Sequence, residues 1–165
     1  MIFETERLFV RKLAFTDFES FHEMQSNKNV MRFVRAKVMT YDDNKKDLKD
    51  VIEKYDNPTN DFWIYAVERK SDSVFVGTIA FVKDKKDDEI GYRFLEKYWG
   101  NGYGTEIIQG MISYAKKIKF PSLIAYVSPD NIGSEKIIKG ANFTFLESVL
   151  CEDLGIPENK YILEL

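Results

Sequence analysis

The stretch Tyr98-Trp99-Gly100-Asn101-Gly102-Tyr103-Gly104-Thr105-Glu106 places three glycines at alternate positions, directly before a segment with helical periodicity at 105–118. Glycines let the backbone turn sharply and leave its N–H groups open to a ligand. The first N–H groups of a helix lack internal partners, and that helix end carries partial positive charge. The stretch therefore predicts a phosphate-binding turn, with Thr105 as a cap or a further phosphate donor. A tight turn without a ligand is the alternative.

Two familiar phosphate motifs do not fit this stretch. A P-loop ends in Gly-Lys-Ser/Thr, but Gly104 is followed by Thr105 and Glu106. The dinucleotide fingerprint reads G-x-G-x-x-G, whereas these glycines read G-x-G-x-G. Asp130 lies near where a ribose-binding acid would fall, so a nicotinamide-dinucleotide protein stays open as a minor alternative.

Patterning on both sides of the glycines predicts a mixed α+β domain. Alternating or β-branched segments predict strands, and i, i+3, i+4 spacing predicts helices. The residues Thr16-Asp17-Phe18-Glu19 read as a capping box that opens the first helix. A charged turn is expected at 83–88, and 27–41 reads as irregular. The expected strands are 7–12, 62–68, 74–82, 89–95, 123–127, 143–150 and 160–165. The first expected helix ends near residue 26, and the other helices cover 42–56, 105–118 and 131–140.

The bulk composition limits the possible functions. With 165 residues, 44% of them hydrophobic, the chain reads as one domain, 1–165. Its net charge of -3 argues against a nucleic-acid partner. Neither an apolar membrane span nor a signal peptide is apparent, so a cytoplasmic protein with no membrane partner is expected. The lone Cys151 and lone His22 suggest no metal site.

Several motifs together resemble the GNAT acetyltransferases. Trp99-Gly100-Asn101-Gly102-Tyr103-Gly104 is similar to their Q/R-x-x-G-x-G/A pyrophosphate loop, with Trp99 in the Q/R place. Tryptophan there, the string Glu89-Ile90-Gly91-Tyr92 and the opening Thr5-Glu6-Arg7-Leu8 resemble the RimJ/RimL-like branch, which acetylates protein N-termini. Asn131-x-x-Ser134, followed by Phe143, matches a downstream element of the family.

The resemblance implies a fold and a coenzyme. The fold is a mixed, mostly antiparallel sheet of about six or seven strands with helices on both faces, splayed in a V between the fourth and fifth strands (89–95 and 122–127). Acetyl-CoA would be the co-substrate, without a metal, and an amine the acceptor. A homodimer is common in the family. The residues implied in coenzyme binding are Trp99, Gly100, Asn101, Gly102, Tyr103, Gly104, Thr105 and Asn131.

The catalytic residues follow from the needs of amide formation. Because an amine is protonated near neutral pH, a base must accept its proton, and Glu89 at the start of a strand is the candidate, with Asp88 as its substitute. Many relatives protonate the leaving thiolate with a tyrosine at the place of Ile138, so Ser134 is the candidate here. Gly91 within the strand predicts a bulge or a close backbone approach.

Two function classes stay open on the sequence alone. The first is an N-acetyltransferase whose acceptor is a protein N-terminus or a small amine such as a polyamine or an aminoglycoside. The second is a non-catalytic coenzyme-A-binding sensor or regulatory domain, which the absence of tyrosine at Ile138 keeps open.

Overall fold

A computed structural model describes all 165 residues. Its single sheet has eight strands in the order β1-β2-β3-β4-β5-β6-β8-β7. The predicted α+β class is confirmed, and the sheet is wider than expected because the two-residue β1 pairs with β2. The strands are β1 (Phe3–Glu4), β2 (Leu8–Lys12), β3 (Phe62–Arg69), β4 (Val74–Asp84), β5 (Asp87–Phe94), β6 (Ser122–Val127), β7 (Thr144–Cys151) and β8 (Ile156–Glu164).

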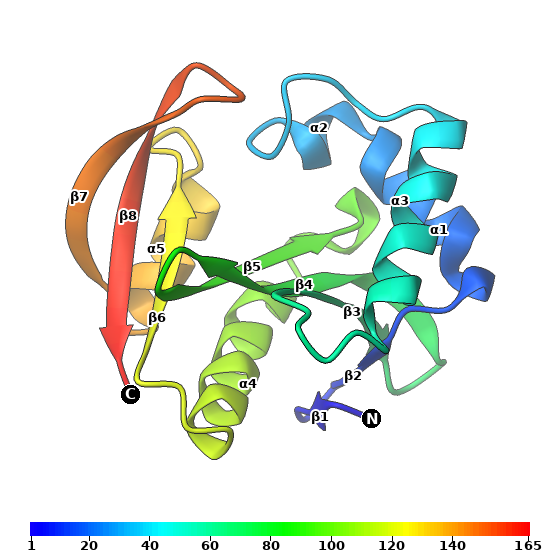
Figure 1. Ribbon diagram of the computed structural model, residues 1–165, viewed down its shortest axis with the longest axis horizontal. Coiled ribbons are helices and arrows are strands. Elements are labelled where there is room, and N and C mark those ends of the chain that lie inside the picture. Colours follow the sequence, from blue (N-terminus) through cyan, green and yellow to red (C-terminus); the bar gives the residue numbers. More distant parts are fainter.

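Five α-helices cover the sheet on both faces, as Figure 1 shows. They are α1 (Phe18–Ser26), α2 (Lys28–Met31), α3 (Tyr41–Lys54), α4 (Tyr103–Lys117) and α5 (Ile132–Gly140), with single 3-10 turns η1 (Phe15–Asp17) and η2 (Glu96–Tyr98). The first three helices lie on one side of β3–β5, and α4 lies on the other. Tyr114 of α4 packs on Phe81 of β4 with ring centroids 5.8 Å apart, whereas Tyr55 after α3 donates a hydrogen bond to the carbonyl of Ile64. No helix is long and apolar enough to cross a membrane.

The sheet opens between β5 and β6. These strands are the only parallel neighbours, joined through α4, and their pairing is confined to Glu89 opposite Ile124. All other neighbouring strands run antiparallel. The expected V-shaped splay is confirmed, although the two-residue β1 makes these the fifth and sixth strands. A single parallel crossover also rules out the doubly wound dinucleotide-binding fold.

Register divides the strand residues beside this opening between two faces. Glu89, Gly91 and Arg93 of β5 lie opposite Val82, Ala80 and Thr78 of β4. Directly paired residues share a face and successive residues alternate, so these six residues lie on the face toward α1–α3. Ile90, Tyr92 and Phe94 point toward α4. Each face of β5 therefore presents a different chemistry to the opening.

Several local predictions were wrong. Thr16 and Glu19 form no capping box. Instead, Asp17 turns back to accept a hydrogen bond from Ala14 N at 2.8 Å and pairs with Arg11, also at 2.8 Å. The segment expected to be irregular contains α2, because the Asn27 side chain caps it by accepting from the N–H groups of residues 29 and 30. The predicted charged turn shrinks to residues 85–86 because β4 and β5 extend into it.

Gly91 does not form a bulge against β4, because the β4–β5 register is continuous through it. The closest backbone approach is at Gly77 in β4 instead. A Cβ at Gly77 would lie 2.1 Å from the Arg93 carbonyl oxygen and 2.9 Å from Phe94 Cα, whereas one at Gly91 would meet only Ala80 Cβ at 3.8 Å. Gly77 therefore lets β5 pass close to β4 beside the opening.

We expect Gly77→Ala to lower the free energy of unfolding by about 3 kcal/mol, because the added methyl group collides with backbone that cannot give way. Urea unfolding monitored by circular dichroism measures this change. Gly91→Ala is the matched control and should cost less than about 1 kcal/mol. Equal losses in the two variants would contradict the close approach at Gly77.

Candidate active site

The loop between η2 and α4 is fixed by its own side chains. Trp99 Nε1 donates to the carbonyl oxygen of Phe94 at 2.9 Å, and the Asn101 amide donates to the carbonyl oxygen of Trp99 at 3.2 Å. Gly100 and Gly102 have φ angles of 76° and 78°, a left-handed conformation that costs glycine no Cβ clash. The loop therefore has its shape before any ligand binds.

Helix α4 begins directly after this loop. Gly102 is its N-cap, and no side chain caps the helix. The N–H groups of Tyr103, Gly104 and Thr105 consequently have no acceptor within the helix. This is the backbone arrangement expected of a phosphate site. The suggestion that Thr105 caps the helix was wrong, since it lies inside the first turn and its hydroxyl stays available for a ligand.

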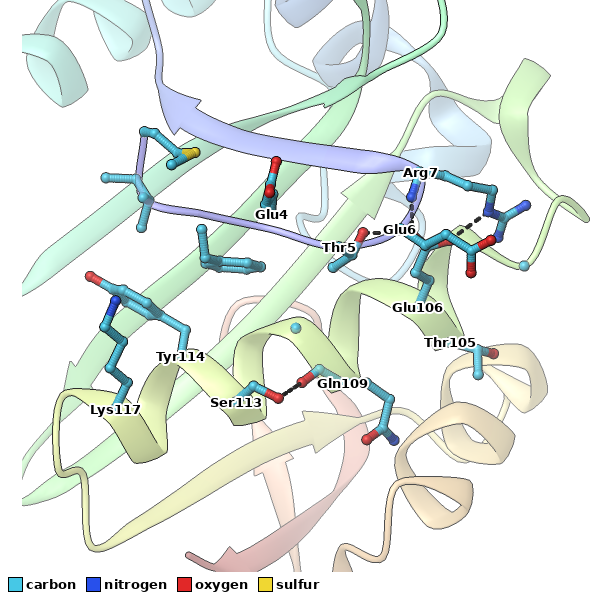
Figure 2. A pocket seen from close by; sticks show the side chains of 15 residues that line it. Glu4, Thr5, Glu6, Arg7, Thr105, Glu106, Gln109, Ser113, Tyr114 and Lys117 are labelled. Carbon is cyan, nitrogen blue, oxygen red and sulfur yellow. Dashed lines mark hydrogen bonds and ion pairs between the residues drawn. The ribbon is translucent and has the colours of Figure 1, made fainter.

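The N-terminal segment braces the loop through Glu106 (Figure 2). Glu106 Oε1 accepts hydrogen bonds from Thr5 Oγ1 at 2.5 Å and from Arg7 N at 2.7 Å, and its Oε2 binds Arg7 Nε at 2.6 Å. Arg7 Nη1 in turn donates to the carbonyl oxygen of Asn101 at 3.0 Å. The opening Thr5-Glu6-Arg7 motif and the glycine-rich loop, far apart in sequence, thus form one structure through this clamp.

Glu106→Gln should destabilise the protein by about 1–2 kcal/mol, because it leaves the Arg7 guanidinium without its carboxylate. Burial opposes the charge of Glu106, but hydrogen bonds from Thr5 and Arg7 outweigh it and hold the pKa of Glu106 below its usual value. The clamp's contribution is therefore complete above the unfolded pKa and is lost as the pH falls through the lower folded pKa.

Thermal unfolding of Glu106→Gln and wild type between pH 3 and 7 measures this effect, and the gap should close at the acid end. Glu4→Gln is the matched control. Glu4 lies in the same N-terminal segment but forms an exposed ion pair with Lys70 at 2.9 Å, so its loss should cost less than about 0.5 kcal/mol. A gap that stays constant with pH would contradict the clamp.

A cleft of about 1070 Å³ runs through the opening of the sheet. It brings together nearly all the predicted site residues: Glu89, Trp99, Gly100, Gly102, Tyr103, Gly104, Thr105, Asn131 and Ser134. Asn101 is the exception, because its amide is used within the loop and its carbonyl faces Arg7. The strand faces divide the cleft into two parts. We call the part on the α4 and α5 side the coenzyme lobe and the part on the α1–α3 side the acceptor lobe.

Glu89 lies in the acceptor lobe among other acids. Burial, and then the charges of Asp84 and Glu158, raise the pKa of Glu89 to about 7, while Lys160 opposes this shift. Lys160 is itself engaged by Asp87 at 2.8 Å. A carboxyl with a pKa near neutrality can accept a proton from an amine at the pH of a cell.

Asp88 is differently placed. It belongs to the same strand but forms an ion pair with Lys83 at 2.8 Å and does not line the cleft. This placement favours Glu89 over Asp88 as the base.

In the coenzyme lobe, two residues with hydroxyl groups, Tyr92 and Ser134, line the cleft. The Tyr92 hydroxyl is buried without a hydrogen-bond partner, and Ser134 lies at the start of α5. Burial raises the pKa of Tyr92, and Ser134 opposes that shift. Asn131 caps α5 by accepting from Ser134 N at 3.2 Å, while Ile138 is buried in the core. An unpartnered buried hydroxyl is costly, so the lobe fits a ligand that offers polar atoms.

Sequence reasoning missed three contributors to the site: Tyr92, Arg93 and Glu106. The alternation of side chains along β5 places Tyr92 and Arg93 on opposite faces of the sheet. Which lobe each face borders depends on the positions of the helices, and the sequence does not give these. Glu106 is the last residue of the glycine-rich stretch, and the sequence indicated no role for it. The recognised Thr5-Glu6-Arg7 motif signalled a role for the N-terminus but not its partner.

Comparisons with known proteins agree with this architecture. The family model described as an acetyltransferase (GNAT) domain matches residues 7–144. An uncharacterised N-acetyltransferase, YnaD of Bacillus subtilis, is 30% identical over 138 residues, which cover 82% of this chain and 78% of that protein.

Solved structures are similar over nearly the whole chain. A GNAT-family acetyltransferase from Bacillus anthracis has 26% identity and a TM-score of 0.85, and the match covers 98% of this chain and 97% of that one. RimL, a ribosomal L7/L12 alpha-N-protein acetyltransferase in complex with coenzyme A, shares the fold at 16% identity and a TM-score of 0.81, over 98% of this chain and 96% of its own. On the family match and this architecture together, the chain belongs to the GNAT family and is an acetyl-CoA-dependent acetyltransferase.

Proposed function

We propose that residues 1–165 form one catalytic domain that transfers the acetyl group of acetyl-CoA directly to a primary amine. The observation that carries this proposal is the joining, in one cleft, of an uncapped helix start behind the glycine-rich loop and a carboxyl whose pKa is about 7. The first suits the coenzyme's phosphates, and the second suits an amine that must lose a proton.

The coenzyme-binding residues are those that the sequence indicates. The backbone of Gly100, Gly102, Tyr103, Gly104 and Thr105 would hold the pyrophosphate, and Asn131 would contact the pantetheine arm from the start of α5. Bound acetyl-CoA supplies an activated acetyl group. Trp99 and Asn101 contribute by shaping the loop, since the Trp99 indole bonds to the Phe94 carbonyl at the end of β5 and the Asn101 amide bonds to the Trp99 carbonyl.

Two groups then move protons on opposite sides of β5. Glu89 takes a proton from the ammonium before it attacks, or from the neutral amine as it attacks, directly or through a water molecule. As the new C–N bond forms and the C–S bond breaks, the Ser134 hydroxyl donates to the leaving sulfur, and Tyr92 beside it can replenish that proton. Because Glu89 and Ser134 enter different lobes, base and acid stay apart during the transfer.

The sequence motifs narrow the range of possible acceptors only in part. Resemblance of the Thr5-Glu6-Arg7 segment and the tryptophan loop to the RimJ/RimL-like branch supports a protein N-terminus. The acids near Glu89 would also suit the amino group of a small amine. A cytoplasmic location and a homodimer remain predictions.

An acetylation assay tests the proposal. Purified protein and acetyl-CoA are mixed with N-terminal peptides or small amines, one acceptor at a time. A colorimetric thiol assay follows the release of free coenzyme A, and mass spectrometry identifies the acetylated amine. We expect transfer to at least one amine and, with acetyl-CoA alone, no acetylated protein, since transfer is direct. Tight coenzyme binding without transfer to any amine would instead support the sensor function.

A further inference from the structure

Arg93 lies in the acceptor lobe, at the opposite end of β5 from Glu89. It shares the α1–α3 face with Glu89 and Gly91 and lines the same cleft. Four residues of extended strand separate the Cα atoms of Glu89 and Arg93 by about 13 Å. An acceptor whose amine lies near Glu89 can thus reach Arg93 only if it extends along the strand.

The Arg93 guanidinium has no anion beside it. Its Nη1 donates to the neutral Gln25 Oε1 at 2.6 Å and approaches Met31 Sδ at 3.8 Å, while Nε and Nη2 have no acceptor in the chain. Gln25 Nε2 in turn donates a hydrogen bond to Asp47 at 2.8 Å, and Asp47 also forms an ion pair with Arg35 at 4.0 Å. The nearest negative charge is therefore indirect and already divided between two arginines.

This environment is costly for a cation. Burial, and then the charge of Arg35, lower the pKa of Arg93 to about 10, while the charge of Asp47 only partly opposes this shift. A partly buried guanidinium normally finds a carboxylate or phosphate, which its planar fork binds through two donors. The two free nitrogens of Arg93, Nε and Nη2, therefore point to an anion supplied by a ligand.

The rest of the acceptor lobe is also basic at the Arg93 end and acidic at the Glu89 end. Arg32, after α2, lines the Arg93 side and lies 5.0 Å from the Phe33 ring centroid without an ion pair. Glu89 and Glu158 line the other end. The sheet between these ends is apolar, with side chains from Phe62, Ile64, Ala80 and Val82. A polyamine or an aminoglycoside would place positive charge against both arginines.

We propose that Arg93 binds a carboxylate of the acceptor, and that the acceptor is a short molecule with a primary amine at one end and a carboxylate at the other. This inference rests on the proposed acetyl transfer. An extended peptide spans about 3.3–3.6 Å per residue, so a dipeptide or tripeptide matches the space between the acidic and basic ends. Its middle would lie on the apolar sheet residues.

Paired acceptors test the proposal. Alanyl-leucine as the free acid and as its C-terminal amide differ only in the charge that Arg93 would bind. Acetylation of both is measured in wild type, Arg93→Met, Arg93→Lys and the control Lys49→Met, whose exposed lysine pairs with Glu53 on α3. An amine bearing a phosphate is tested in parallel, and acetyl-CoA binding to each variant reports whether it is folded.

We expect wild type and Lys49→Met to prefer the free acid by about 10- to 100-fold in kcat/KM, the range for a hydrogen bond to a charged group. Arg93→Met should lose this preference while acetylating the amide within about threefold of wild type, and Arg93→Lys should recover part of it. Equal use of acid and amide by wild type, an equal loss of both in Arg93→Met, or a preference for the phosphate alone would each overturn the carboxylate site. If wild type acetylates no amine at all, the proposed transfer itself fails.

Discussion

Glu89→Gln should lower kcat/KM for amine acetylation by about 100- to 1000-fold, the contribution typical of a positioned general base. The reason lies in the placement of Glu89 in the acceptor lobe, where burial and the charges of Asp84 and Glu158 raise its pKa to about 7. The wild-type rate should therefore rise with pH through about 7, beside the later rise caused by the acceptor's own amine. In the variant only the amine's ionisation should remain, near 8 for an α-amine.

The same substitution should stabilise the protein at alkaline pH. The pKa of Glu89 is raised from 4.5 to about 7, so the folded state holds its proton more tightly than the unfolded state does. Stability consequently falls as the pH rises from about 4.5 to 7, and the penalty is complete above that window. Glu89→Gln removes a penalty of up to about 3 kcal/mol at pH 8 and changes little at pH 4.5.

Initial rates and thermal unfolding over this pH range measure both effects. Glu147→Gln is the control, because Glu147 is exposed on the edge strand β7 and outside the cleft. It should change neither the rate nor the pH profile by more than about twofold. A Glu89→Gln enzyme that keeps its activity, or an Asp88→Asn enzyme that loses it, would show that the base is misassigned.

Gly102→Ala should weaken acetyl-CoA binding by about 10- to 100-fold. Gly102 has a φ of 78° and is the N-cap of α4. A side chain in this left-handed conformation costs about 1–2 kcal/mol, and relief of that strain would turn the first N–H groups of α4 away from a common point. The added Cβ would also lie 3.5 Å from Arg7 Nη2, in the clamp that braces the loop.

Gly155→Ala separates binding from strain. Gly155, between β7 and β8, has a comparable φ of 63° and nothing within 4 Å of an added Cβ. Both variants should therefore lose similar thermal stability, but only Gly102→Ala should lose affinity in calorimetric titrations with acetyl-CoA. Similar affinities in the two variants would mean that the loop geometry does not serve the coenzyme.

The sequence predicted well those features of the fold that depend on residues close together in the chain. Three glycines and the helical periodicity after them located the loop and α4, and the continuous apolar run from Leu123 located β6. Asn142, two residues after the end of α5, has a φ of 67°, a left-handed conformation that asparagine tolerates better than most residues. Each of these features depends on residues within a few positions of one another.

Features that depend on distant contacts were missed or misread. The predicted Thr16–Glu19 capping box failed because Asp17 is instead held by Arg11 of β2. Likewise, nothing near Glu106 in the sequence indicates that it binds Thr5, 101 residues earlier, and Arg7, 99 residues earlier. The role of Arg93 could not be predicted for the same reason, since it depends on Gln25 being its only oxygen acceptor.

The central claim is that the glycine-rich loop and the opening between β5 and β6 form a coenzyme site. The most direct test is a calorimetric titration of the wild-type protein with acetyl-CoA, coenzyme A and NADH in parallel. We expect saturable one-to-one binding of acetyl-CoA and coenzyme A and no heat from NADH. Binding of NADH, or of none of the three, would contradict this claim and reduce the glycine-rich loop to a turn between a strand and a helix.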